Sequence, residues 1–148
     1  MNDSCTADQA VFSCDKQPKL KIFTNADVKS ICESRLARCI YAETLSSSLH
    51  AVEQLCVMVR NTNRNLIEIA NDKSVFESLN QNSPRHKYLL VNYEDPKFQI
   101  CLRAVQNMKN LPDKIMNATR FHRADIIPDW ATAIGSIAET DDLLFYKD

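Results

Sequence analysis

The chain has 148 residues, a net charge of −1, 45% hydrophobic residues and 25% charged residues. This length favours one domain around one core, and the composition excludes the disordered and fibrous classes of protein. Lys and Arg are scattered along the chain, so no basic stripe indicates a nucleic-acid partner. No run approaches the roughly 20 apolar residues of a membrane span, and the polar, acidic start is unlike a secretory signal.

Glycine is nearly absent from this chain, because Gly135 is its single copy. Tight hairpin turns and left-handed helix caps normally use glycine, so an all-β meander is disfavoured. Glycine-rich phosphate-binding loops are missing too, which excludes P-loop and dinucleotide-binding sites. We therefore expect a mainly α fold whose helices are joined by Asn, Ser and Asp turns.

Two helices are expected in the first half of the chain. Residues 1–24 are interpreted as an N-terminal leader and residues 25–148 as the folded domain. Asn25 or Asp27 is expected to cap the first helix. The serines at 46–48 interrupt the helical pattern and offer caps for a second helix. Apolar positions at helical spacing are Val28, Cys32, Leu36 and Cys39 in the first helix, and Leu49, Val52, Leu55, Cys56 and Val59 in the second.

The second half is expected to hold shorter elements. Short helical pieces are predicted at 66–70 and 75–79, and an extended segment at 86–93. Asp95-Pro96 predicts a helix start, with a cap followed by proline at the first helical position. That helix carries an apolar face formed by Phe98, Cys101, Leu102, Val105 and Met108. Short helices broken by Pro112 and Pro128, then an extended segment at 143–146, complete the prediction.

Six cysteines form an even set that could indicate disulfides. Cys32 and Cys39, however, are separated by about 10 Å of helical rise and cannot bridge each other. Together with Cys56 and Cys101 they lie on apolar faces, so we expect four buried free thiols. The best candidates for a reactive or paired thiol are in the leader, at Cys5 and Cys14. No metal site or cofactor is expected, because Cys-x-x-Cys is absent and His50, His86 and His122 lack ligand spacing.

Glu43 stands at an unusual position for a carboxylate. At 100° per residue it falls within the arc of the first helix's apolar residues, and should face the core. Burial among apolar neighbours favours the protonated form, which would make Glu43 a proton donor near neutral pH. Two structural alternatives remain: Arg35 lies near the same face and could pair with Glu43, or a frayed helix end could turn Glu43 outward.

Several short motifs resemble one known family. They are Leu36-Ala-Arg-Cys-Ile-Tyr-Ala-Glu43, Ala51-Val52, Val75-Phe-Glu-Ser78, Asn117-Ala-Thr-Arg-Phe-His122, Pro128-Asp-Trp-Ala131 and Phe145-Tyr-Lys147. In this order, over residues 36–147, they resemble the SleB-type cell-wall hydrolases, which are spore-cortex lytic enzymes with phage relatives. The chain departs from the family in lacking most of its glycines, in the register of an Asn-Arg pair, and in having Leu143 where a histidine is usual.

The resemblance implies a lysozyme-like helical domain with a small extended element and a groove for peptidoglycan glycan strands. It implies cleavage between N-acetylmuramic acid and N-acetylglucosamine, by hydrolysis or lytic transglycosylation, with Glu43 as general acid and no cofactor or metal. Hydrolysis would need a second carboxylate, for which Asp125 and Asp129 are the candidates. The residues implied to bind substrate are Tyr41, Phe121, His122, Trp130 and Tyr146.

Other interpretations of the same residues stay open. A lone tryptophan is more often part of a core, His122 could be a surface histidine, and Tyr146 could anchor the end of the chain. The alternative function is a non-catalytic structural or peptidoglycan-docking protein on the same fold, such as a phage virion component with virion or cell-envelope partners. Without a cleft, a small helical regulator would be favoured. The sequence does not fix the localisation: the first two functions place the protein at the cell envelope or in a phage virion.

Overall fold

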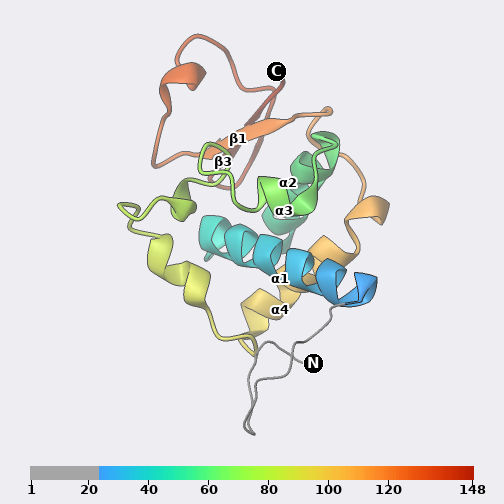
Figure 1. The fold of residues 1–148 in the computed structure, drawn as a ribbon. Coiled ribbons are helices and arrows are strands. Elements are labelled where there is room, and N and C mark those ends of the chain that lie inside the picture. The colour runs from blue at the N-terminus through green and yellow to red at the C-terminus, as the bar shows by residue number, and fades with distance from the viewer. Residues whose placement is uncertain (1–23) are drawn as a thin grey trace, which may run out of the picture. The chain divides into compact units, whose positions relative to one another are not determined.

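A computed structural model describes residues 24–148, so the expected leader lies outside the described residues except for Thr24 (Figure 1). The described part contains four α-helices, four short 3-10 helices and three strands. The helices are α1 (Asn25–Thr44), α2 (Leu49–Asn61), α3 (Leu66–Ile69), η1 (Glu77–Leu79), η2 (His86–Leu90), α4 (Pro96–Gln106), η3 (Met108–Asn110) and η4 (Asp129–Ala131). The strands are β1 (Arg120–Arg123), β2 (Ala138–Thr140) and β3 (Leu143–Tyr146). The prediction of a mainly α fold with a small extended element is confirmed.

The chain divides into two units between Ile31 and Cys32. The described part of the first unit is the start of α1. There Thr24 Oγ1 accepts from the Asp27 amide at 3.1 Å, and the Asp27 carboxylate accepts from the Thr24 amide at 3.0 Å. This reciprocal capping box satisfies two donors that a helix end would leave free. The predicted cap, Asn25 or Asp27, was therefore wrong, because Thr24 is the cap and Asp27 completes the box.

The second unit, residues 32–148, has its core between the helices and the sheet. α2 packs against α4, η3, β1 and β2, and it is the element with the most neighbours. The largest fully buried apolar side chains are Phe76, Phe98, Phe145, Leu36, Ile40, Leu55, Met58, Ile69, Ile115 and Leu143. The predicted stripes of α1 and α2 are buried from Leu36 and Val52 onward, whereas Val28 and Leu49 are exposed and Cys32 is half-buried. Val28 and Leu49 lie in the first turn of their helices. Because helical side chains lean toward the helix N-terminus, these two extend past the packed part of the helix.

Local signals decide where α2 and α4 begin. The Ser48 hydroxyl accepts from the Ala51 amide, and the Asp95 carboxylate accepts from the amides of Lys97 and Phe98. Pro96 occupies the first turn of α4, where its missing N–H costs no hydrogen bond. Both helix starts were predicted from the sequence and are confirmed.

The sheet is antiparallel, with β3 in the centre and β1 and β2 at its edges. The prediction of an extended segment at 143–146 is confirmed as β3. Backbone turns with positive φ use non-glycine residues, as the scarcity of glycine requires, and three of the five are Asn or Asp. They are Leu45, Asn63, Met116, Asn117 and Asp141.

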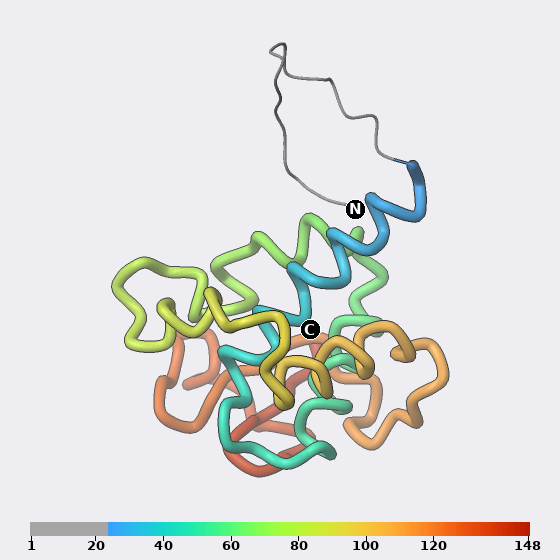
Figure 2. Tube along the Cα trace, turned by 90° about the horizontal axis from the view of Figure 1, so that it is seen from below, coloured from blue at the N-terminus to red at the C-terminus, as the bar shows by residue number. Residues whose placement is uncertain are grey.

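The segment 86–93 was predicted to be extended, and this was wrong. It forms η2, in which the Tyr88 amide donates to the Arg85 carbonyl and the Val91 amide to the Tyr88 carbonyl. Arg38 holds its end through Nη1, which donates to the carbonyls of Leu89 at 3.0 Å and Val91 at 2.7 Å. In Figure 2 this segment and the segment 106–116 lie on opposite sides of the unit, as they also do in Figure 1.

The cysteines of the described part are free thiols, as predicted. Cys39, Cys56 and Cys101 are buried, and Cys32 is half-buried, while Cys5 and Cys14 lie outside the described residues. Among residues 24–148, no helix combines the length and the apolar character needed to cross a membrane. In the same range, no group of three or more His, Cys, Asp or Glu side chains is placed to hold a metal ion.

Candidate functional site

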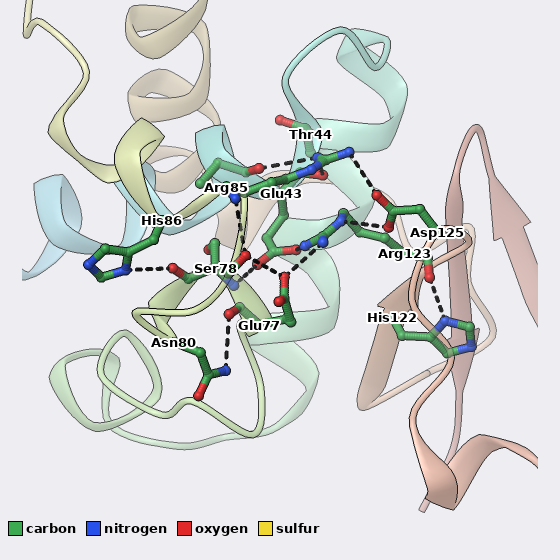
Figure 3. Close-up of polar contacts among 12 residues, drawn as sticks. Glu43, Thr44, Glu77, Ser78, Asn80, Arg85, His86, His122, Arg123 and Asp125 are labelled. Carbon is green, nitrogen blue, oxygen red and sulfur yellow. Dashed lines mark hydrogen bonds and ion pairs between the residues drawn. The ribbon is translucent and has the colours of Figure 1, made fainter.

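Glu43 lies in the last turn of α1, and its side chain is 1% exposed. Its Oε1 accepts from Arg123 Nη1 at 2.5 Å, and its Oε2 accepts from the Ser78 amide at 3.0 Å (Figure 3). The prediction that Glu43 faces inward is confirmed, but its carboxyl group contacts a charged guanidinium and a backbone amide, whereas apolar side chains were expected. The alternative of a pair with Arg35 is wrong, because Arg35 Nη2 donates to Asn71 Oδ1 at 3.1 Å.

Arg123 is the centre of a buried charge cluster. Besides Glu43, its guanidinium binds Glu77 Oε1 through Nη2 at 2.7 Å and Asp125 Oδ1 through Nε at 3.0 Å. Its side chain is only 3% exposed. Burial alone would lower the pKa of Arg123, but the charge of Glu43 and the hydrogen bonds to Glu77 and Glu43 raise it above its ordinary value. Arg123 is therefore a permanent cation shared by three carboxylates.

Residues of η1 and of the loop before η2 hold this cluster against the end of α1 (Figure 3). Arg85 Nη1 donates to the carbonyls of Ala42 at 3.2 Å and Glu43 at 3.0 Å. These are carbonyls that the end of a helix leaves without partners, and a cation is favourable there. Ser83 Oγ donates to Glu77 Oε1 at 2.8 Å, the same oxygen that accepts from Arg123.

A pocket of about 470 Å³ opens beside the cluster. Its lining combines charged residues with apolar and aromatic residues. Its lining consists of Glu43, Lys73, Ser74, Glu77, Phe121, His122, Arg123, Ile126, Ile127, Pro128, Asp129 and Trp130. The structure thus brings Glu43, Phe121, His122 and Trp130 to one cavity. Of the two candidate second carboxylates, Asp129 lines the pocket, whereas Asp125 lies outside this lining and pairs with Arg123 and Arg85.

Tyr146 contributes to the site through His122. It is 4% exposed, and its hydroxyl lies 2.8 Å from His122 Nε2. His122 Nδ1 lies 2.7 Å from the Arg123 carbonyl, which can only accept, so Nδ1 carries the proton and Nε2 accepts from Tyr146. Trp130 stands edge-on to both rings, at centroid distances of 5.8 Å from His122 and 5.0 Å from Tyr146. The three rings contact one another, and His122 and Trp130 line the pocket, whereas Tyr146 is not part of its lining.

Tyr41 is not brought to this pocket. Tyr41 precedes Glu43 by two positions in α1. At 100° per residue the side chains of Tyr41 and Glu43 are about 200° apart around the helix axis, so they point in different directions. Tyr41 packs against the core, and burial raises its pKa, with a further contribution from the charge of Asp95. The implied role of Tyr41 in binding substrate has no support in this geometry.

Sequence reasoning missed three residues of the site, Arg123, Glu77 and Ser78. A signal was present for Arg123, which directly follows the matched Phe121-His122 and lies two residues after Phe121, on the same face of β1. Glu77 stood inside a weakly matched segment, between Phe76 and Ser78, without a role. Family models, curated proteins and solved structures were compared with the chain, and none of them matches it.

Proposed function

We propose that this protein cleaves the glycan strands of peptidoglycan, with Glu43 as the proton donor. The observation that carries the proposal is the position of Glu43. Its buried carboxylate reaches a pocket whose wall includes Phe121, His122 and Trp130. These are residues that the resemblance to SleB-type hydrolases implies for glycan binding, and they come from a part of the chain some 80 residues away.

The shape and lining of the pocket suit a carbohydrate. Sugar rings have apolar C–H faces and polar edges, and the pocket offers both kinds of surface. Ile126, Ile127 and Trp130 form apolar walls, while Glu77 and Lys73 place charged groups at the polar side. A few placed polar groups among apolar walls are typical of small-molecule and cofactor sites.

One carboxyl group is sufficient for the reaction in its transglycosylase form. Glu43 donates its proton to the glycosidic oxygen as the bond from that oxygen to the muramic anomeric carbon breaks. The 6-hydroxyl oxygen of the same muramic residue then bonds to the anomeric carbon, and its proton passes to the Glu43 carboxylate. No water is consumed, the product is an anhydromuramic end, and Glu43 returns to its protonated state.

Arg123 makes the protonation of Glu43 compatible with burial. Both Glu43 oxygens accept hydrogen bonds, one from Arg123 and one from the Ser78 amide. When Glu43 takes up a proton, the buried Arg123 keeps Glu77 and Asp125 as partners. It is therefore not left as an unpaired buried charge, which would cost several kcal/mol.

The test uses purified peptidoglycan and three proteins, namely wild type, Glu43→Gln and Glu68→Gln. Glu68 is an exposed residue of α3 outside the pocket, so it is a matched control. We expect wild type and Glu68→Gln to reduce turbidity and to release anhydromuramic products detected by mass analysis. Glu43→Gln should lose about 10²- to 10⁴-fold in rate. Equal rates for wild type and Glu43→Gln would reject the mechanism.

A second function, peptidoglycan docking without cleavage, is favoured by one specific observation. Each oxygen of Glu43 already has a hydrogen-bond partner inside the protein, Arg123 for one and the Ser78 amide for the other, which is the arrangement of a structural carboxyl group. Leu143 in place of the family's usual histidine agrees with this function. Cosedimentation with insoluble peptidoglycan separates the two candidates. Binding by wild type and Glu43→Gln alike, without any product from either, would support docking.

A further inference from the structure

A second pocket, of about 410 Å³, adjoins the first. The two share Ser74, Phe121 and Trp130 in their linings, so Trp130 borders both. The second pocket differs from the first in its charge. Three cations line it, and they come from the loop between α2 and α3, from β1 and from the segment after β3. These residues are Arg64, Arg120 and Lys147.

The two arginines already bind carboxylates of this chain. Arg64 Nη2 lies 2.9 Å from Asp72 Oδ2, and Arg120 Nη1 lies 3.2 Å from Asp148 Oδ1. Both pairs are partly exposed, and Asp148 is 64% exposed. Exposed pairs of this kind contribute little stability, so an incoming anion can replace the resident partner at small cost. Lys147 has no ion-pair partner among residues 24–148, which leaves it available to an anion.

Arg120 connects this charge to the first pocket. Its guanidinium lies over the Trp130 ring at 3.9 Å from the centroid. With the ring against its face, the guanidinium presents its N–H edge to ligands, and a planar, two-oxygen ligand could bind there in place of Asp148. A carboxylate bound to Arg120 would therefore lie next to a ligand group that contacts Trp130 in the first pocket.

We infer that the second pocket binds a carboxylate carried on the muramic branch of the glycan strand, while the sugars themselves occupy the first pocket. The choice of a glycan rests on the proposed function; the choice of a carboxylate rests on the arginines and on Lys147. Muramic acid differs from glucosamine by a lactyl ether ending in a carboxyl group, which a stem peptide extends with further carboxylates. Either source provides the same chemistry at the pocket, next to the sugar that carries it.

The test is a binding titration that needs no cleavage. Trp130 is the single tryptophan of the chain and borders both pockets, so its fluorescence reports binding directly. Three soluble ligands are compared, all on the Glu43→Gln background: a chito-oligosaccharide without carboxylate, a glycan fragment with the bare lactyl carboxylate, and the same fragment with its stem peptide. The variants are Lys147→Gln and Arg64→Gln, with Lys109→Gln, an exposed residue of η3, as the matched control.

We expect the carboxylate-bearing fragments to bind more tightly than the chito-oligosaccharide, and this advantage to shrink as salt is added. Lys147→Gln and Arg64→Gln should each weaken those fragments by about 2- to 5-fold and leave the chito-oligosaccharide unchanged. Tighter binding of the lactyl fragment alone identifies the lactyl carboxylate as the ligand, and a requirement for the peptide identifies its carboxylates. Equal affinity for all three ligands overturns this inference and leaves the proposed cleavage intact. Binding of none of them overturns both, whereas carboxylate-dependent binding without any cleavage by wild type overturns only the cleavage.

Discussion

Arg123 Nη1 donates to Glu43 Oε1 at 2.5 Å, and this buried contact joins β1 to the last turn of α1 across 80 residues of chain. Both side chains are almost fully buried. A buried ion pair of this kind has opposing effects on stability, because the two charges attract each other but both lose their hydration. Its main consequence is that neither partner can be removed alone without leaving the other charge uncompensated.

The first prediction is that Arg123→Met destabilises the fold strongly, by about 3–5 kcal/mol in the free energy of unfolding. The variant leaves the Glu43 carboxylate buried with only the Ser78 amide as donor. Glu77 and Asp125 suffer less, because both are partly exposed and can be hydrated. Urea denaturation followed by circular dichroism measures the loss.

The double variant Glu43→Gln with Arg123→Met is the control for this prediction. A neutral amide at position 43 needs less compensation than a carboxylate, so the double variant should be more stable than the sum of the single changes predicts. We expect an interaction energy of about 1–3 kcal/mol between the two sites. Additive losses would show that the pair contributes no coupling and that Arg123 acts only through packing.

Local signals in the sequence were sufficient for the parts of the fold that depend on a few neighbouring residues. Asp95-Pro96 starts α4 because a capping carboxylate and a preset backbone angle act within one turn. The inward position of Glu43 followed from the helical period alone. In both cases the residues that cause the feature lie within a few positions of it, so the feature can be predicted from the local sequence.

Features that depend on distant residues were not predictable in the same way. The partner of Glu43 was sought one or two turns away, at Arg35, whereas the real partner, Arg123, comes from another element. Similarly, η2 was expected to be extended because its apolar pattern has no helical period. Arg38 of α1 binds two of its carbonyls, so a contact between elements decides its conformation. Tertiary contacts outweigh local preference in both places.

A second prediction concerns the thiols. Burial raises the pKa of Cys39 to about 12 and that of Cys101 to about 11, from an ordinary value near 9. Only the thiolate reacts readily, so both should resist alkylation at pH 7.5 in the folded protein. Cys32 is half-buried and should be labelled. Peptide-resolved mass spectrometry before and after denaturation tests this, and full native labelling of Cys39 would contradict the packing described.

The same two thiols predict an alkaline loss of stability. Each thiol has a higher pKa in the folded protein than in the unfolded chain, where it is near 9. Below pH 9 both states keep the thiol proton, so stability is at its full value. Above that pH the unfolded chain loses its thiol protons first, so stability should fall as the pH rises from about 9 to about 12. Cys39→Ala is the matched variant, and its stability should decline less steeply over this range. Identical slopes would assign the alkaline loss to other groups.

A third prediction concerns the Ser78 hydroxyl. Ser78 is fully buried, and its Oγ has no hydrogen-bond partner among the described residues. The contacts that matter to the site use its backbone, through the amide to Glu43 and the carbonyl to His86 Nδ1. Ser78→Ala keeps both contacts and removes the unsatisfied group, so stability should equal that of wild type or exceed it by up to about 1 kcal/mol. A loss above 1 kcal/mol in urea denaturation would mean that the hydroxyl has a partner after all.

The last prediction separates the two chemical outcomes through Glu77. Glu77 lines the pocket with Glu43, shares Arg123 with it, and is the more exposed of the two carboxylates. A hydrolase needs a second carboxylate to assist the water or to bond the sugar, whereas a lytic transglycosylase can reuse Glu43. On the proposed mechanism Glu77→Gln keeps a hydrogen-bonding group beside Arg123 and removes nothing that reacts. We therefore expect a rate loss below about 10-fold, against about 10²- to 10⁴-fold for Glu43→Gln.

Asp125→Asn and Asp129→Asn complete this comparison, because they are the other two carboxylates near the pocket. Both should retain cleavage with anhydromuramic products, and mass analysis distinguishes these from reducing ends by the mass of one water. If Glu77→Gln were as inactive as Glu43→Gln and wild type gave reducing ends, the enzyme would be a two-carboxylate hydrolase. If only Asp129→Asn were as inactive as Glu43→Gln, the second carboxylate of the hydrolase would be Asp129 of η4. Because each variant removes a single carboxylate, the pattern of rate losses identifies which carboxylate, if any, assists Glu43 in the second step of the reaction.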